Sequence, residues 1–202
     1  MHPRTIIFIG PQGSGKGTQI EKLHTLISKR DPVRRLVDIQ TGRRFRALAA
    51  KHETFGERKI AQTLKTGELQ PDFLVHFLWA EAMFAQLDPK SHVLIDGVPR
   101  TLEQAKMLDD GLRFFERGAL DVVNLAVPEE IVRERMQARA RSDDTDESIE
   151  TRLRWYREDT VPVLDYYRGR PDTVVHDIDG TQDIDAVHTA IADALDISHH
   201  DH

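Results

Sequence analysis

Residues 10–19 read GPQGSGKGTQ and directly follow the apolar run Thr5–Ile9, TIIFI. Gly10, Gly15 and Lys16 have the spacing G-x-x-x-x-G-K, typical of a loop whose backbone N–H groups bind phosphate. In the general pattern a Ser or Thr follows the lysine and contacts Mg²⁺. Here Gly17 holds that position, and the hydroxyl comes one residue later, at Thr18. A strand, this loop and a helix in succession aim backbone N–H groups at an anion, so we predict that Lys16 reaches the phosphates of a nucleotide.

Short apolar runs alternate with helical patterns along the rest of the chain. We predict strands at residues 5–9, 36–39, 92–96, 122–127 and 173–178, with helices between them. This alternation predicts an α/β fold of three layers, in which helices cover both faces of a five-stranded parallel sheet. Ligands of such sheets bind beyond the carboxyl ends of the strands.

Four helix boundaries are also readable from the sequence. Segment 41–70 has helical patterns but no strand, and is predicted to be a helical insert with Gly67 as a C-cap. Thr101 and Gln104 predict a capping box, and Pro128 predicts the start of a helix over 129–139. A further helix is predicted from about Glu147 to Arg157.

Composition excludes several classes of function. The net charge of −6 argues against sequence-independent nucleic-acid binding, and no apolar run is long enough to cross a membrane. The chain has no cysteine, which excludes disulfides and thiolate chemistry and is compatible with a reducing cytosol. We expect a single-domain, monomeric, cytoplasmic protein with no nucleic-acid or membrane partner. The terminal SHHDH is interpreted as a frayed end rather than a metal site.

Asp96 ends the predicted strand 92–96 in the stretch VLIDG. In phosphate-loop proteins, an acid at such a strand end usually helps to hold Mg²⁺, so we predict that Asp96 binds this ion directly or through water. The alternative is a simple turn acid, because Asp-Gly is a common turn pair.

Arginines gather in the second half of the chain. Arg135 and Arg139 share one helix face, and Arg141 and Arg152 follow closely. Salt bridges on a solvated helix, with Glu134 and Glu147 as partners, would be one explanation. Phosphoryl transfer is the other, because it needs cationic groups around the equatorial oxygens and little covalent help from the protein.

These segments together resemble the adenylate kinase family of nucleoside monophosphate kinases. GPQGSGKGTQ is similar to its GxPGxGKGTQ loop, IQTGRRFR to STGDxLR, and LIDGVPRT to LxDGFPRT. RERMQAR with RSDD resembles the two arms of the family's lid. TVPVLDYY and DIDGT resemble its T-x-P-[LV]-x-x-Y-Y helix and its V-D-G-T segment. The resemblance implies a P-loop NTPase fold with a core of residues 1–40 and 71–197, an acceptor-binding insert at 41–70 and a minimal lid at 138–146.

The resemblance also implies a role for individual residues, with ATP as donor, AMP as acceptor and Mg²⁺ as cofactor. Donor binding falls to Gly13, Ser14, Gly15, Lys16, Gly17, Thr18, Arg135, Arg139 and Gln182. Acceptor binding falls to Thr41, Arg46, Gly97, Arg100, Gln104, Arg141 and Arg152. Catalytic roles fall to Lys16, Arg100, Arg139, Arg141, Arg152 and Asp143.

Three positions depart from the family pattern. Arg43 stands where STGD has its acid, which puts metal placement in doubt and adds a cation. Val98 replaces the Phe of DGFPR, and the lid is shorter than the family's short form, without cysteines for zinc.

Thr41 and Gln104 favour adenine in the acceptor site. A UMP or CMP kinase with the same mechanism remains an alternative. A catalytically weak nucleotide-binding homologue is another, suggested by Arg43 and the short lid.

Overall fold

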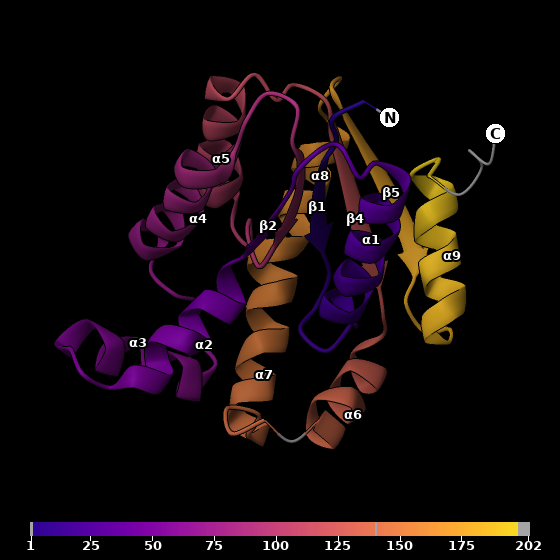
Figure 1. Ribbon diagram of the computed structural model, residues 1–202. Helices are drawn as coiled ribbons and strands as arrows, with labels where there is room; N and C mark the ends of the chain where they lie inside the picture. The colour runs from indigo at the N-terminus through magenta and orange to yellow at the C-terminus, as the bar shows by residue number, and fades with distance from the viewer. Residues whose placement is uncertain (1, 140, 198–202) are drawn as a thin grey trace.

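A computed structural model describes residues 2–139 and 141–197, so the terminal SHHDH lies outside the described part. One parallel sheet forms the centre, in the order β2-β3-β1-β4-β5 (Figure 1). Its strands are β1 (Thr5–Ile9), β2 (Leu36–Gln40), β3 (His92–Asp96), β4 (Leu120–Ala126) and β5 (Thr173–Asp179). The predicted five-stranded parallel sheet is confirmed, with strand ends shifted by up to two residues.

Helices cover both faces of this sheet and complete the three layers. One face packs against α1 (Lys16–Arg30) and α9 (Ile184–Ala194), and the other against α4 (Asp72–Gln86), α5 (Leu102–Phe114) and α8 (Val161–Arg168). All of β1 is buried, and its side chains alternate between the two cores: Ile6 and Phe8 face α1 and α9, whereas Ile7 and Ile9 face the other layer. Strands buried on both faces are continuous apolar runs for this reason.

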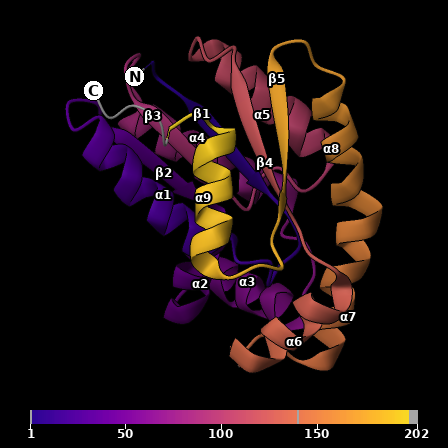
Figure 2. The ribbon, with the colours of Figure 1, turned by 90° about the vertical axis from the view of Figure 1, so that its right-hand side faces the viewer.

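The remaining helices lie beyond the carboxyl ends of the strands, as Figures 1 and 2 show. They are α2 (Thr41–Lys51), α3 (Phe55–Thr66), α6 (Glu129–Arg139) and α7 (Asp146–Trp155). A capping box between Thr54 and Glu57 starts α3, and Gly67 ends it in the left-handed conformation at φ 77°. The predicted helices within 41–70 and the predicted C-cap are therefore present.

The chain does not leave the helical conformation after α7, contrary to the predicted end near Arg157. A π-helical turn over Tyr156–Thr160 joins α7 to α8. Pro162 stands near the start of α8, where its missing N–H and its ring are incompatible with an undisturbed helix interior. Within the described ranges, no helix has the length and apolar character needed to cross a membrane.

Candidate functional site

The loop between β1 and α1 requires glycine at two close approaches. Gly10 and Gly13 have φ values of 146° and 90°, in the region that side chains disfavour. A Cβ on Gly10 would lie 2.8 Å from the Leu125 carbonyl oxygen, and one on Gly13 would lie 2.9 Å from Met136 Cγ. The loop backbone therefore packs closely against the end of β4 and against α6. Lys16 is the first residue of α1, so the helix N-terminus opens at this loop.

Lys16 bends back over its own loop. Its Nζ donates hydrogen bonds of 2.8 Å to the carbonyl oxygens of both Gly10 and Pro11. Burial lowers the pKa of Lys16 to about 8; Asp96 opposes this shift, and the charges of Arg100 and Arg139 add to it. The ammonium group thus stands among cations and backbone carbonyls, a setting that favours an incoming anion.

A cavity of about 460 Å³, here called the cationic cleft, opens beside this loop. Seven cationic side chains and two carboxylates among the described residues line it, although the whole chain is acidic. The cations are Lys16, Arg43, Arg46, Arg100, Arg135, Arg139 and Arg141, and the acids are Glu21 and Asp96. Backbone at Gly13, Gly15, Gly17 and Thr18 also lies on its wall. Such an excess of positive charge binds polyanions.

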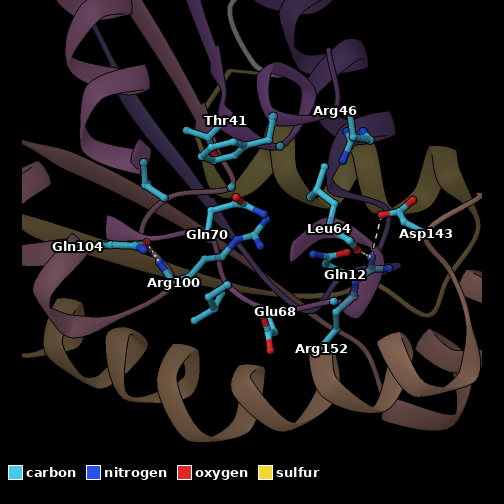
Figure 3. A pocket seen from close by; sticks show the side chains of 16 residues that line it. Gln12, Thr41, Arg46, Leu64, Glu68, Gln70, Arg100, Gln104, Asp143 and Arg152 are labelled. Carbon is cyan, nitrogen blue, oxygen red and sulfur yellow. Dashed lines mark hydrogen bonds and ion pairs between the residues drawn. The ribbon is translucent and has the colours of Figure 1, made fainter. Parts of the chain in front are cut away.

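A second cavity, here called the inner pocket, lies between the sheet and the helices α2 and α3 (Figure 3). It encloses only about 30 Å³. Its lining includes Thr41, Gln104, Asp143 and Arg152. It shares five lining residues with the cationic cleft, namely Gln12, Gly42, Arg46, Gly97 and Arg100. The two cavities therefore meet at the guanidinium groups of Arg46 and Arg100.

Burial lowers the pKa of both junction arginines, and direct contacts also hold Arg100 in place. Burial, followed by the charge of Arg141, lowers the pKa of Arg46. Burial also lowers the pKa of Arg100 to about 10, and Asp96 opposes this shift. The Arg100 guanidinium lies 5.0 Å from the centre of the Trp155 ring, and its carbonyl accepts a 2.9 Å hydrogen bond from Thr160 Oγ1. The π-helical turn thus fixes the Arg100 backbone through Thr160.

Gln104 is buried at the far end of the inner pocket with its amide fixed at both atoms. Its Oε1 accepts the Arg100 backbone N–H at 2.8 Å, and its Nε2 donates to Asp72 Oδ1 at 2.8 Å. The predicted capping box is only half formed: Thr101 accepts from the Gln104 N–H, but the Gln104 side chain bonds to Arg100 instead of the cap residue. The amide is diverted because the Arg100 N–H and the Asp72 carboxylate bind its two polar atoms.

Gly97 packs tightly against the Thr41 side chain at the pocket entrance. Gly97 has a φ of 84°, and a Cβ there would lie 2.5 Å from Thr41 Oγ1. The start of α2 and the end of β3 are therefore packed together at a point where only glycine fits.

Asp144 anchors the arginines of the loop between α6 and α7. Its carboxylate accepts hydrogen bonds from Arg139 Nε and Nη2, at 2.6 and 2.9 Å, and from Arg152 Nη1 at 2.5 Å. Asp143 accepts one further bond from Arg152, at 2.7 Å. Burial favours the neutral acid, but hydrogen bonds and charges from both arginines hold the pKa of Asp144 below its usual value.

Helix α3 is attached to α7 by backbone acceptors at its end. Arg152 Nη2 donates to the Leu64 carbonyl at 3.2 Å, and Trp155 Nε1 donates to the Gly67 carbonyl at 3.0 Å. A Cβ on Gly67 would lie 2.5 Å from the Ser148 carbonyl oxygen. This tight contact closes the inner pocket on the side of α7.

Two predicted site residues line neither cavity. The Ser14 side chain is buried beneath the loop, where its Oγ lies 3.4 Å from Lys16 Nζ. Gln182 is exposed in the turn after β5 and bonds to Asp179. Arg135 reaches this turn, because its Nη1 donates to the Gly180 carbonyl at 2.9 Å.

Asp96 fits the predicted role at a metal ion. Its Oδ1 is buried and has no hydrogen-bond partner within the described ranges, although the residue lines the cationic cleft near Lys16. An unpaired carboxylate oxygen of this kind suits a hydrated cation. Residues 2–139 and 141–197 contain no group of three or more His, Asp or Glu side chains that could hold a metal by themselves.

Sequence reasoning did not select Asp144 or Asp72. The pair Asp143–Asp144 was visible as a short acidic loop, but no spacing tells which acid turns inward. Asp72 offered no signal, because its partner Gln104 is distant in sequence. Arg43, which departs from the family pattern, forms an exposed 3.1 Å ion pair with Glu21 on α1.

Comparisons with known proteins agree with this geometry. The family model described as adenylate kinase matches residues 8–171. The chain is 34% identical to an adenylate kinase of Corynebacterium urealyticum, over 95% of this chain and 98% of the relative. It is 38% identical to adenylate kinase 1 of a Nostoc species, with 88% and 92% covered, and 32% identical to an adenylate kinase of Archaeoglobus fulgidus, with 90% and 93% covered. The chain therefore belongs to the adenylate kinase family of nucleoside monophosphate kinases, and it is a phosphotransferase.

Proposed function

We propose that this enzyme transfers the γ-phosphoryl group of ATP to AMP and releases two molecules of ADP. One observation carries the proposal: the cationic cleft and the inner pocket meet at Arg46 and Arg100. Two anionic ligands that enter from opposite sides would bring their phosphates together at this junction. The relatives' printed name, adenylate kinase, supports the same reaction.

The donor occupies the cationic cleft in this proposal. The loop amides from Gly13 to Thr18 and the N-terminus of α1 bind its phosphates, and Lys16 exchanges its bonds to the Gly10 and Pro11 carbonyls for phosphate oxygens. Arg135 lies where it can stack on the donor base beside the Gly180 turn. Ser14 supports the loop from beneath, and Gln182 offers backbone groups to the base.

The acceptor occupies the inner pocket. Arg46 and Arg100 bind its α-phosphate as bidentate partners. Thr41 and Gln104 lie along its base. Because Asp72 takes one hydrogen of the Gln104 amide nitrogen, the second hydrogen remains as a donor. The N1 atom of adenine accepts a hydrogen bond, whereas the N3 atom of uracil carries a proton, so this fixed amide favours adenine.

Positioning and charge neutralisation carry the chemistry. A phosphate oxygen of AMP forms the new bond to the γ-phosphorus, while the bond from that phosphorus to the leaving oxygen of ADP breaks. The nucleophile is already anionic, so no side chain has to remove a proton. Lys16, Arg139, Arg141 and Arg152 surround the transferred group. Asp144 orients Arg139 and Arg152 toward it, and Asp143 adds a bond to Arg152.

Asp96 would hold Mg²⁺ through its water shell, using the unpaired Oδ1. The ion supplies further neutralisation of the phosphate oxygens. Thr18 lies on the same wall of the cationic cleft and provides the hydroxyl that Gly17 lacks.

We assign residues 41–70 as the insert that binds the acceptor and 138–146 as the lid, within a core of 1–40 and 71–197. The insert is the part that must move, because an inner pocket of about 30 Å³ is too small for a nucleoside. Its opening requires release of the bonds from α7 to Leu64 and Gly67. Closure then buries the acceptor against Arg152.

Measuring ADP formation from ATP with AMP, GMP, CMP and UMP as separate acceptors tests the proposal. We expect turnover with AMP to exceed turnover with the pyrimidine nucleotides. Equal or faster turnover with UMP or CMP would assign the enzyme to the pyrimidine monophosphate kinases instead. Tight nucleotide binding without detectable ADP would identify a catalytically weak homologue.

A further inference from the structure

Gln70 is a buried side chain of the inner pocket that the proposed mechanism does not use. It lies between α3 and α4, is 7% exposed, and lines the pocket together with Thr41, Arg100 and Gln104. In the view of Figure 3 its side chain stands between those of Thr41 and Arg100. A polar side chain buried this deeply normally has a hydrogen-bond partner for its polar atoms.

The Gln70 amide has one polar atom bound and the other free. Its Nε2 donates a 2.7 Å hydrogen bond to Thr63 Oγ1. Its Oε1 is buried and has no hydrogen-bond partner within residues 2–139 and 141–197. A buried acceptor without a partner is unfavourable by itself, and a ligand that brings a donor removes this penalty. The free oxygen therefore points to a ligand with an N–H or O–H group.

Thr63 determines which atom of the Gln70 amide stays free. The Thr63 hydroxyl donates its single hydrogen toward the carbonyl oxygens of Ile60 and Lys59, at 3.0 and 3.2 Å. Toward Gln70 the Thr63 oxygen can therefore only accept, and a reversed amide would place two acceptors against each other. Gln70 lines both the inner pocket and an outer groove between α3 and α4, whereas the described lining places Thr63 in the groove alone. The amide nitrogen is thus held on the groove side, and the oxygen is left for the inner pocket.

Gln70 lies at the end of the inner pocket that holds Gln104. Asp72, which accepts the hydrogen bond from Gln104 Nε2, follows Gln70 by two residues, so the Cα atoms of Gln70 and Asp72 are at most about 7 Å apart. Arg46 and Arg100 mark the opposite end, where the pocket meets the cationic cleft. With the acceptor phosphate at these arginines, its base lies beside Gln70 and Gln104.

We propose that Gln70 is a specificity-determining residue, whose Oε1 accepts a hydrogen bond from the amino group of the acceptor's base. This inference rests on the proposed function, which places that base beside Gln104. Adenine has an amino group next to an unprotonated ring nitrogen, so Gln70 accepts from the amino group while Gln104 donates to the nitrogen. Guanine and hypoxanthine have a carbonyl oxygen at the position of this amino group, and Gln70 Oε1 would face it as a second acceptor. Gln70 therefore selects nucleoside monophosphates with an amino group at that position.

Purine riboside 5′-monophosphate isolates this contact, because it keeps the N1 atom of adenine but has no amino group. Calorimetric titration of the intact chain with AMP and with this analogue compares the two affinities. We expect the unchanged protein to bind AMP at least ~10-fold more tightly, and Gln70→Leu to bind both ligands about equally through loss of AMP affinity alone. Gln62→Leu is the matched control, because Gln62 is an exposed glutamine of α3, and it should keep the full preference. The ratio of kcat/KM for the two acceptors should change in the same way.

Thr63→Val provides a second variant that keeps the Gln70 side chain. It removes the bond that orients the amide, so the preference for AMP should fall about ~3-fold. Circular dichroism verifies that the variants are folded, and Thr63→Val decides the question if Gln70→Leu is not.

Three results would overturn the assignment of Gln70. They are an unchanged protein that binds both ligands equally, a Gln70→Leu variant with the full preference for AMP, and a Gln70→Leu effect confined to the ratio between AMP and 2′-deoxy-AMP. The last result would place Oε1 at the ribose. Because the titration needs no turnover, absence of ADP formation with the Gln70 effect intact would contradict only the proposed reaction. Normal ADP formation without a Gln70 effect would contradict only this inference.

Discussion

The guanidinium of Arg152 and the carboxylate of Asp144 form a buried ion pair, with 2.5 Å between Nη1 and Oδ1. Arg152 is 3% exposed, and Asp144 also holds Arg139 through two bonds. One carboxylate therefore fixes two cations that belong to different helices, α6 and α7. This shared acid therefore sets the positions of both guanidinium groups.

Replacing Asp144 should reveal this coupling. Asp144→Asn leaves the buried guanidinium of Arg152 without its full countercharge, and removal of one partner of a buried pair costs about 3–5 kcal/mol of unfolding free energy. Denaturant unfolding and the initial rate of ADP formation measure the two effects, and we expect turnover to fall at least ~10-fold by misplacement of the arginines. Asp143→Asn is the control, because Asp143 accepts a single bond and is partly exposed. Equal losses in both variants would contradict the central role of Asp144.

Asp144 also predicts a pH dependence of stability. Its pKa is lowered in the folded state, so its stabilising contribution is complete above the unfolded value of ~3.9 and is lost as the pH falls through the lower folded value. The unfolding free energy of the unchanged protein should therefore decrease below about pH 4 more steeply than that of Asp144→Asn. Urea unfolding between acidic and neutral pH makes the comparison, and parallel curves would refute it.

Lys16 should lower the free energy of unfolding at neutral pH while it strengthens nucleotide binding. Its pKa falls from 10.5 to about 8, so between these values the unfolded chain binds more protons and the unfolding free energy rises with pH. Lys16→Met removes a buried charge and should unfold at higher denaturant than the unchanged protein at pH 7. Its turnover should fall at least ~100-fold, as expected for a lost preorganised charge.

The same pKa predicts how binding depends on pH. Lys16 loses its charge above about pH 8, so calorimetric ATP affinity of the unchanged protein should weaken there. Lys16→Met should bind weakly on both sides of this pH. Near-full activity in the variant, or an affinity unchanged across pH 8, would exclude contact between Lys16 and phosphate.

Asp72 should determine acceptor choice through Gln104. Asp72→Ala frees the Gln104 amide to rotate, and loss of one hydrogen bond of about 0.5–1.5 kcal/mol should reduce the preference for AMP over UMP up to ~10-fold. Asp72→Asn keeps an accepting oxygen and should retain most of the preference. The ratio of kcat/KM for the two acceptors is the measurement. An unchanged ratio in Asp72→Ala would mean that the amide is fixed by Arg100 alone.

Trp155 should slow entry to the inner pocket. Trp155→Phe keeps a ring beneath Arg100 but removes the hydrogen bond to the Gly67 carbonyl. Loss of about 1 kcal/mol from the closed state should raise the AMP association rate about five-fold in stopped-flow experiments. Tyr156→Phe, in the neighbouring turn, serves as the control. An unchanged rate would place the slow step elsewhere.

Arg43 should affect binding without affecting stability. Its ion pair with Glu21 is exposed on both sides, with side chains 62% and 67% exposed, so Arg43→Ala should change the unfolding free energy by less than ~1 kcal/mol. Because Arg43 lines the cationic cleft, the variant should bind ATP more weakly, and increasingly so at low salt. Calorimetric titration at two salt concentrations measures this. Tighter binding would show that Arg43 opposes the donor or its metal.

Sequence reasoning reached the fold because local signals and tertiary structure agree here. Buried parallel strands such as Thr5–Ile9 are continuous apolar runs, and the glycines of the loop mark close backbone approaches. The arginines also lie on the elements that the sequence predicts for them, because local signals and tertiary structure agree there too. Sequence reasoning could not predict the diverted side chain of Gln104, because helix capping is a local rule and the competing partner, Asp72, comes from another helix. It assigned a role to Asp143 and did not select Asp144, which bonds to both Arg139 and Arg152, because direction within a short loop depends on packing.

The small volume of the inner pocket has a consequence for the solvent. A space of about 30 Å³ holds about two water molecules. While the acceptor is absent, few waters can therefore occupy the inner-pocket side of Arg46 and Arg100, whereas their other side faces the cationic cleft, a space of about 460 Å³. In the proposed reaction, the segment held to α7 at Leu64 and Gly67 would keep water out of the acceptor's place, and protection of the donor from water would depend on the residues around the cationic cleft.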